Sequence, residues 1–221
     1  MGLETAVRIG NRHTEMFANH SLGFCLTAAG RYAEAADVQP KALEQARALK
    51  ARRYGAVILA HCAEVALING RKAEALALAR EGREISNEAG PGFTGPILYG
   101  LLALLEDRHE DQEIALVAGE ALLAQGCVGH NHFWFRRYAI ERALLFQDWE
   151  EADRQSDALL LRMADEPLTY SSLVAERGHM LARRGRGEAT EDDEDRLKAT
   201  LAAARVIDMR IDALGHALRR I

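Results

Sequence analysis

The stretch GCVGHNHFWFRRY, residues 126–138, concentrates the side chains of this sequence that are best suited to chemistry. Cys127, His130 and His132 are residue types that bind zinc, and a zinc site takes four such ligands in a tetrahedron. Their spacing is not that of a common zinc motif, and two histidines two residues apart on a helix point in nearly opposite directions. A metal site would therefore need an extended loop and further ligands from elsewhere, and we expect neither a metal nor another cofactor.

The same residues also suggest a nucleophilic centre in which a histidine activates the thiol of Cys127. Such a site needs a lowered thiol pKa and a group that binds an oxyanion, and the sequence shows neither. The structural alternative is a loop over 126–131 that joins two helices, with Asn131 as the N-cap of the second helix. We expect no catalytic residue here and interpret the cysteine and the histidines as parts of this joint.

Trp134, Arg137 and Glu141 form a second pattern, because positions i, i+3 and i+7 share one face of a helix. An aromatic ring beside an arginine and a glutamate suits the recognition of a peptide or a small ligand. In the alternative interpretation, Trp134 packs into the neighbouring unit and Arg137 pairs with Glu141, four residues further along the helix. The sequence leaves both interpretations open.

Helices must position these side chains, because strong helix formers dominate the rest of the sequence. Only four prolines occur in 221 residues, and clusters of β-branched residues are scarce. The hexapeptides GRYAEA at 30–35 and GRKAEA at 70–75 mark an internal repeat of 40 residues. Weaker copies start at 107, 147 and 185, so that the spacing stays between 37 and 40 residues.

A second mark recurs in the same register, seven residues before the start of each hexapeptide. Four of the five residues at this position are small, which predicts a close approach of helices where no larger side chain fits. The residue in the fourth unit is isoleucine, so we expect this unit to pack differently. The five residues are Gly23, Ala63, Gly100, Ile140 and Gly178.

The sequence therefore predicts an all-α protein: one domain over 1–221, folded as a right-handed superhelical solenoid of about five helix-turn-helix repeats and a terminal helix. The predicted units are 1–50, 51–89, 90–128, 129–166 and 167–206, with a closing segment 207–221. The first helices of the units are predicted at 3–28, 53–69, 95–106, 132–146 and 168–184. The second helices are predicted at 32–50, 72–88, 110–125, 149–164 and 190–206, and the closing helix at 208–220.

Three local signals refine these helices. Pro96 suits the first turn of a helix, where no backbone N–H is needed. Thr190 and Asp193 have the spacing of a capping box. Pro40 falls inside a predicted helix, and we expect a kink or a break near 38–39.

The stretch LGFCLTAAGRYAEAADV, residues 22–38, resembles a tetratricopeptide repeat. That family has Leu–Gly in the first helix, Gly at the turn, an aromatic residue two positions later, and Ala in the second helix. The matching positions are Leu22–Gly23, Gly30, Tyr32 and Ala35. The resemblance implies a helical solenoid whose first helices line a concave groove, and its period here is longer than the usual 34 residues.

The segments RHTEMFANHSLGF, PGFTGPILYGLLALLED and GHNHFWFRRYAIERALL resemble the C-terminal helical region of bacterial signalling proteins that join a class III adenylate/guanylate cyclase domain to an ATPase module. The resemblance implies that this chain is a portion or a relative of such a protein, with the cyclase and ATPase domains as attached partners. Neither the metal-binding aspartates of a cyclase nor a phosphate-binding GxxxxGK[ST] loop occurs in the sequence. The resemblance therefore implies no cyclase or ATPase activity for these residues.

A concave groove would bring residues of several units together. Besides Trp134, Arg137 and Glu141, we expect His20, Glu64 and His179 to face it, because each lies close to the recurring small residue of its unit. The alternative for these three is an exposed or locally hydrogen-bonded side chain.

Bulk properties narrow the function. A net charge of −5 argues against nucleic acid as a partner. No apolar run reaches the length of about 20 residues that crosses a membrane, and three unpaired, widely spaced cysteines fit the reducing cytoplasm. We expect a non-enzymatic scaffold for protein–protein interaction. Its exposed end faces would also allow it to form a homodimer. The alternative is a sensor that binds a metabolite in the groove, and the third hypothesis is a metal-dependent or cysteine hydrolase centred on 127–132.

Overall fold

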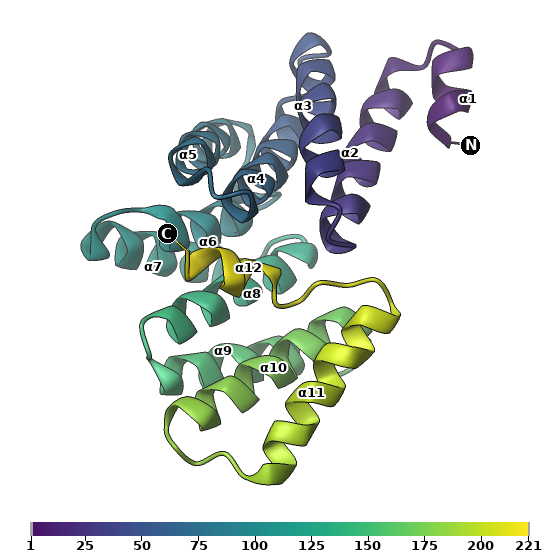
Figure 1. Cartoon of the computed structure of the whole chain (residues 1–221). Coiled ribbons are helices and arrows are strands. Elements are labelled where there is room, and N and C mark those ends of the chain that lie inside the picture. The colour runs from purple at the N-terminus through teal and green to yellow at the C-terminus, as the bar shows by residue number, and fades with distance from the viewer. Residues whose placement is uncertain (1, 221) are drawn as a thin grey trace.

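Helices form all the regular secondary structure of residues 2–220, the part of the chain that the computed structural model describes (Figure 1). This confirms the all-α, helical-repeat class. In chain order the helices are α1 (Gly2–Arg8), α2 (Arg12–Ala28), α3 (Tyr32–Ala48), α4 (Arg52–Ile68), α5 (Lys72–Ala89), α6 (Gly95–Leu105), α7 (His109–Gln125), α8 (His130–Leu145), α9 (Trp149–Arg162), α10 (Thr169–Gly185), α11 (Glu191–Val206) and α12 (Ala213–Leu218).

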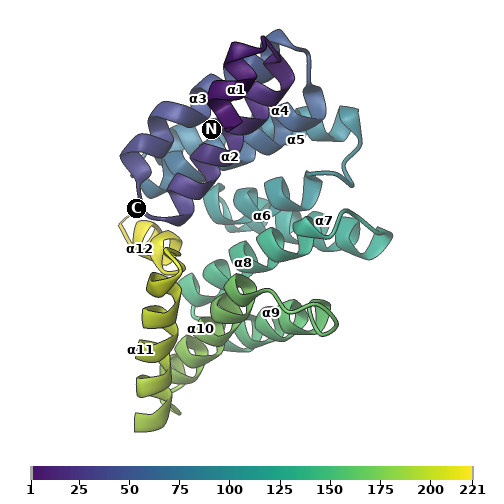
Figure 2. The same cartoon turned by 90° about the vertical axis from the view of Figure 1, so that its right-hand side faces the viewer.

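Consecutive helices pack as hairpins, as the repeat predicted. The pairs are α2–α3, α4–α5, α6–α7, α8–α9 and α10–α11, and each hairpin also packs against the next (Figures 1 and 2). We call α2, α4, α6, α8 and α10 the A helices. The largest group of buried hydrophobic residues runs through α4 to α8 and includes Leu214 and Leu218 of α12.

The recurring small residues lie where helices approach most closely, as predicted. A Cβ atom on Gly23 would come within 2.7 Å of Gln39, and one on Gly100 within 3.0 Å of Tyr138. Ile140, the exception, is fully buried, and its Cγ2 lies 3.0 Å from where a Cβ of Gly178 would stand. The larger side chain of the fourth unit therefore fills the space that the glycine of the fifth unit leaves.

The capping signals are confirmed. Pro96 lies in the first turn of α6. The Thr190 side chain accepts a hydrogen bond from the backbone N–H of Asp193, and the Asp193 carboxylate accepts one from the N–H of Thr190, so both halves of the capping box form.

Three predicted helices are wrong in detail. The first, predicted at 3–28, is divided into α1 and α2 by Gly10, whose φ of +69° is left-handed, and by Asn11, which caps α2. The predicted break at Pro40 does not occur: α3 runs through this residue, which lies on its exposed side where water can reach the freed carbonyl. The closing helix, predicted at 208–220, is only Ala213–Leu218, because residues 207–212 form an irregular connection.

Candidate functional site

The C-terminal segment (residues 207–218) returns from the end of α11 to the A helices α2, α4 and α8. The backbone N–H of Arg210 donates to the carbonyl of Ala28 at the end of α2, at 2.8 Å. Ile211, Leu214 and Leu218 are buried, and α12 packs against α4 and α8 (Figures 1 and 2). The face of the A helices is therefore already covered in part by the chain itself.

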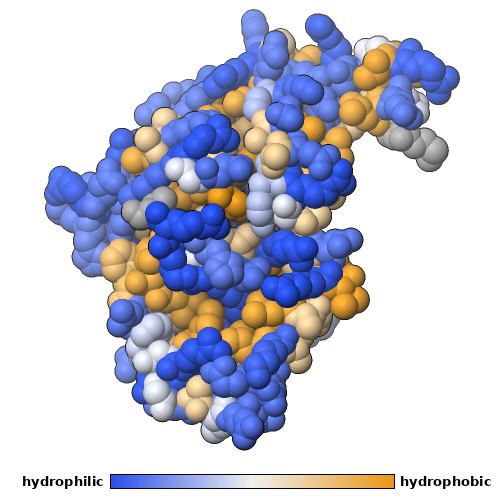
Figure 3. Space-filling view, in the orientation of Figure 1, coloured by the Kyte–Doolittle hydropathy of each residue, from blue (hydrophilic) through white to orange (hydrophobic). Residues whose placement is uncertain are grey.

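A hydrophobic hollow remains on the outer side of this segment. It is lined by Leu144, Leu181 and Leu218 among others, and Figure 3 shows hydrophobic surface on the same face of the molecule.

Under the C-terminal segment lies a cavity of about 80 Å³, which we call the inner cavity. This volume holds several water molecules. Its walls come from α2, α4, α8, α10 and the C-terminal segment. The lining residues are Phe24, Thr27, Ala28, His61, Glu64, Ile68, Trp134, Arg137, Tyr170, Met209, Arg210 and Ala213.

A buried ion pair forms one wall of the inner cavity. Arg137 Nη1 donates to Glu64 Oε1 at 2.7 Å, and the hydroxyl of Tyr138 donates to Glu64 Oε2 at 2.6 Å. Burial alone would lower the pKa of Arg137, but the Glu64 carboxylate together with Tyr170 and Tyr138 more than offsets this and raises it. Burial, and then the same carboxylate, raise the pKa of Tyr138. Both groups therefore keep their protons, and Glu64 is held by two donors.

A second buried ion pair lies farther along the A helices. Arg177 Nη1 donates to Glu141 Oε1 at 2.6 Å, and both side chains are only 3% exposed. Gly215 of α12 covers this pair: a Cβ atom on it would lie 2.7 Å from Glu141 Oε2 and 2.8 Å from Arg177 Nη2. Only a residue without a side chain lets α12 lie so close.

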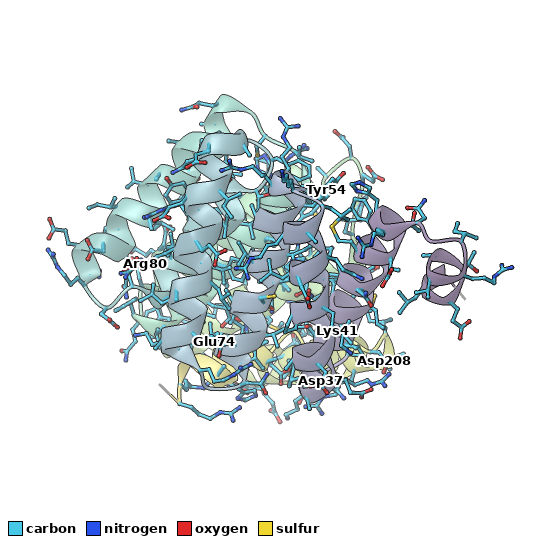
Figure 4. The ribbon with its side chains drawn as sticks, turned by 90° about the horizontal axis from the view of Figure 1, so that it is seen from above. Asp37, Lys41, Tyr54, Glu74, Arg80 and Asp208 are labelled. Atoms are coloured by element: carbon cyan, nitrogen blue, oxygen red, sulfur yellow. The ribbon has the colours of Figure 1, made fainter. Side chains whose placement is uncertain are left out.

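On the same face of α2 and α4, but nearer the start of the A helices, lies an open aromatic groove of about 260 Å³. Its rings contact one another edge to face: Phe17 with Tyr54 at 4.4 Å, Tyr54 with Phe93 at 5.7 Å, and Phe93 with His130 at 5.8 Å between centroids. The lining residues are Phe17, His20, Ser21, Phe24, Tyr54, Val57, His61, Phe93, Ile97, His130 and Trp134. In Figure 4, Tyr54 lies at the opposite end of the A helices from Asp208 of the C-terminal segment.

Phe24, His61 and Trp134 line both the aromatic groove and the inner cavity, and so form a partition between them. The edge of Phe24 meets Trp134 at 5.4 Å, and His20 stacks on His61 at 4.9 Å with ring planes 10° apart. His61 is 9% exposed, yet neither of its ring nitrogens has a hydrogen-bond partner among the described residues. The Nδ1 atom of His20 also lacks one.

All three histidines of the aromatic groove are held in the neutral form. Burial lowers the pKa of His20 and of His130, and lowers that of His61 furthest, where the positive charge of neighbouring groups adds to the effect. Each neutral imidazole has one N–H donor and one nitrogen acceptor. His130 uses its Nε2 on the carbonyl of Phe93, at 3.1 Å, whereas His61 uses neither nitrogen.

The stretch 126–138 is mainly a structural joint. Helix α8 begins at His130 with Gly129 as its N-cap, so the prediction that Asn131 is the cap is wrong. Asn131 is fully buried inside the first turn, where its amide donates to the carbonyls of Gly92, Phe93 and Val128 and ties two loops together.

The metal and nucleophile hypotheses gain nothing from the geometry. Among residues 2–220, no group of three or more His, Cys, Asp or Glu side chains is placed to hold a metal ion, so Cys127, His130 and His132 do not form such a group. Partial burial raises the pKa of Cys127, which disfavours the reactive thiolate.

Four of the six predicted groove residues line the aromatic groove or the inner cavity: His20 the groove, Glu64 and Arg137 the cavity, and Trp134 the partition between them. Glu141 belongs instead to the second ion pair, so the alternative in which it pairs with Arg137 is wrong. Arg137 and Glu141 each pair with a residue of another helix instead of with each other. His179 turns to α9, where it contacts the carboxylates of Asp153 and Asp157.

The sequence interpretation missed His61, the aromatic groove and the part played by the C-terminal segment. One signal was available: the position after the recurring small residue carries Phe24, Glu64 and Glu141 in three units, all of which line the site or its second ion pair. His61 lies two residues before that small residue in α4, within the otherwise apolar run 55–63.

A scan of protein-family models and a search of curated proteins found no match to this chain. None of the helices in the described part of the chain is long and apolar enough to cross a membrane.

Proposed function

We propose that this chain is a non-catalytic regulatory module that binds a small ligand in the aromatic groove, with the C-terminal segment on the opposite side of the partition. The observation that carries the proposal is His61, a buried imidazole with two unpartnered nitrogens in the wall shared by groove and cavity. Buried polar groups are nearly always hydrogen-bonded, and each one left without a partner costs about 1–3 kcal/mol. A ligand that supplies these partners recovers that free energy on binding.

The residues around His61 support a ligand-binding site rather than a void left by imperfect packing. Five aromatic side chains and three histidines meet at one open groove instead of filling a core. Phe17 and Tyr54 remain 37% and 40% exposed although they contact each other. Concave sites lined by aromatic groups with a few polar atoms are typical of small-molecule binding.

A thermal-shift screen of metabolites tests this proposal. A ligand present at about 100 times its Kd adds about 2.7 kcal/mol, which for a chain of this length raises Tm by roughly 5–10 °C. The same ligand should shift His61→Phe by much less, because that variant keeps a ring but loses both nitrogens. His13→Gln, which changes an exposed histidine of α2, is the matched control and should respond like the unchanged protein. A screen without a hit, or hits that His61→Phe retains in full, would contradict the proposal.

A protein–protein scaffold is the second candidate, and the C-terminal segment favours it. In this segment a short helix, α12, packs on the A helices α4 and α8 through its buried apolar residues Leu214 and Leu218. A partner with such a helix would displace it, and amide hydrogen exchange at 211–218 would then rise in the complex. Binding of the attached domains without any change in that exchange would count against this mode.

We also propose the wider context that the sequence resemblance implies: a cytoplasmic module that is part or a relative of a bacterial cyclase–ATPase signalling protein. The test is the reading frame directly upstream, which should encode a cyclase or an ATPase domain. Self-association as a homodimer belongs to the same proposal, and light scattering after size-exclusion chromatography measures it.

A further inference from the structure

The dimensions of the aromatic groove select a flat ligand. Three successive ring contacts have interplanar angles of 84°, 86° and 84°, so the groove presents ring faces and ring edges in alternation. Its volume of about 260 Å³ exceeds the roughly 150 Å³ of an apolar cavity known to hold benzene. The inner cavity of about 80 Å³ lies below that size. One or two fused rings therefore fit the groove and not the cavity.

The charges select an uncharged ligand. No Asp, Glu, Lys or Arg lines the aromatic groove, and its three histidines are neutral. The nearby Arg53 lies against Phe93, with its Nε donating to the carbonyl of Ala89, and Arg137 beyond the partition is paired with Glu64. A charged group taken out of water needs an opposite charge or several hydrogen bonds, and no Asp, Glu, Lys or Arg lines this groove to supply that charge.

The unpartnered polar atoms of the groove indicate which groups the edge of the ligand must carry. His61 contributes one donor and one acceptor, and the unpartnered Nδ1 of His20, stacked on His61, adds a third polar atom. A hydrocarbon ring would bury these atoms without satisfying them. The two nitrogens of one imidazole point in widely different directions, so a ring with a donor or an acceptor on its edge would satisfy one of them.

Together these features define a ligand class. We propose that the aromatic groove binds an uncharged, planar heteroaromatic ring whose edge carries an N–H donor or a nitrogen or carbonyl acceptor that engages one nitrogen of His61. The inference rests on the proposed small-ligand function and deepens it by naming the class of ligand.

The test uses the full-length, ¹⁵N-labelled protein and three probes of similar size at neutral pH: 2-aminopurine, naphthalene and 2-naphthoate. The chain has two tryptophans, so its indole N–H signals provide both a reporter and an internal control. Trp134 lies in the partition, whereas Trp149 packs on Gly185 between α9 and α10. We expect 2-aminopurine to shift the Trp134 signal and leave that of Trp149 in place.

The relative affinities decide the chemistry. We expect 2-aminopurine to bind at least about tenfold more tightly than naphthalene, because naphthalene leaves about one hydrogen bond of the groove unmade. We expect a similar margin over 2-naphthoate, because its carboxylate finds no counter-charge. If naphthalene bound as tightly as 2-aminopurine, the proposed role of His61 would be wrong. If 2-naphthoate bound most tightly of the three probes, the proposal of an uncharged ligand would be wrong.

A variant locates the hydrogen bonds. His61→Phe should lose about tenfold in affinity for 2-aminopurine and keep its affinity for naphthalene. If His61→Phe lost affinity equally for 2-aminopurine and naphthalene, the assignment of the hydrogen bond to His61 would be wrong. If His61→Phe does not fold, the comparison of the three probes is made on His20→Phe instead. If no probe moves Trp134, the ligand class is wrong. A hit of other chemistry from the metabolite screen would then preserve the small-ligand function, whereas a screen without hits would remove both.

Discussion

Two buried ion pairs occupy equivalent places in the repeat but have different surroundings. Glu64 and Glu141 each follow the recurring position of their A helix, and each accepts a hydrogen bond from an arginine of a later A helix. The Glu141–Arg177 pair is covered by Gly215 of α12. The Glu64–Arg137 pair faces the inner cavity beside His61. The same repeat position thus forms a contact covered by α12 in one unit, which we call the closed pair, and a wall of the inner cavity in another, which we call the open pair.

The two ion pairs differ in which groups can hydrogen-bond to the glutamate when its arginine is removed. Water in the inner cavity gives Glu64 an alternative partner when its pair is broken, whereas Glu141, although it also lines the hydrophobic hollow, lies against the backbone of Gly215. Glu64 also keeps a second donor, the hydroxyl of Tyr138, when Arg137 is absent. We therefore expect the closed pair to matter more for folding and the open pair to matter more for binding.

The largest expected effect comes from Arg177→Met, which leaves Glu141 buried without its partner. Loss of one member of a buried ion pair costs about 3–5 kcal/mol, and urea unfolding followed by circular dichroism measures it. Glu141→Leu combined with Arg177→Met removes both charges and should regain most of that loss. As a matched control, Arg184→Met breaks an exposed pair with Glu194 and should cost less than about 1 kcal/mol. A double variant as unstable as the single one would refute this account.

The same substitution in the open pair, Arg137→Met, should cost less, about 2 kcal/mol, the value of a hydrogen bond to a charged group. Tyr138 still donates to Glu64, and water in the inner cavity reaches the carboxylate. The comparison with Arg177→Met under identical conditions is the measurement. If Arg137→Met destabilised the chain as much as Arg177→Met, the two pairs would be equivalent after all.

Gly215→Ala tests the cover over the closed pair. The added Cβ would lie within 2.8 Å of both Glu141 and Arg177, so α12 must move away, at an expected net cost of about 1–2 kcal/mol. Amide hydrogen exchange at 211–218 should rise. Gly55→Ala is the matched control: this helical glycine has no atom within 4 Å of the added Cβ, and the change should be neutral or stabilising by up to about 1 kcal/mol. Unchanged exchange in Gly215→Ala would show that α12 does not depend on this contact.

The sequence was sufficient for the helices because their signals are local. Thr190 and Asp193 identify the start of α11 within one turn, and Pro96 does the same for α6. The recurring glycines were also informative, since the close approach they permit repeats with the period of the chain. Gly10 was missed because a single glycine within a helical pattern is usually tolerated.

The site depended on contacts that no local pattern contains. Glu64 and Arg137 are 73 residues apart, and Arg210 meets Ala28 across most of the chain. Helical spacing placed Trp134 and Arg137 on one face, and the Arg137 guanidinium does lie over the Trp134 ring, 5.4 Å from its centroid, but the carboxylate partner of Arg137 comes from another unit. The return of the C-terminal segment follows from the burial of Leu214 and Leu218 on α4 and α8, which a repeat pattern does not predict.

The smallest effect is a pH dependence that distinguishes the two regions. Burial lowers the pKa of His61 well below its usual value, so below about pH 6.5 the unfolded chain takes up a proton that the folded chain refuses. The stabilisation is complete above that pH and declines as the pH falls. From about pH 7.5 to about pH 5.5 the loss from His61 should reach at most about 1.4 kcal/mol, with smaller contributions of the same sign from His20 and His130.

Urea unfolding at both pH values measures this decline, which His61→Phe should reduce because it removes the titrating group. His13→Gln should leave it unchanged. Arg177→Met should lower stability equally at both pH values, since none of the three histidines lies among the groups found in contact with the closed pair. A decline that His61→Phe does not reduce would place the responsible groups outside the partition, and the contrast between an open, responsive region and a closed, structural one would lose its electrostatic basis.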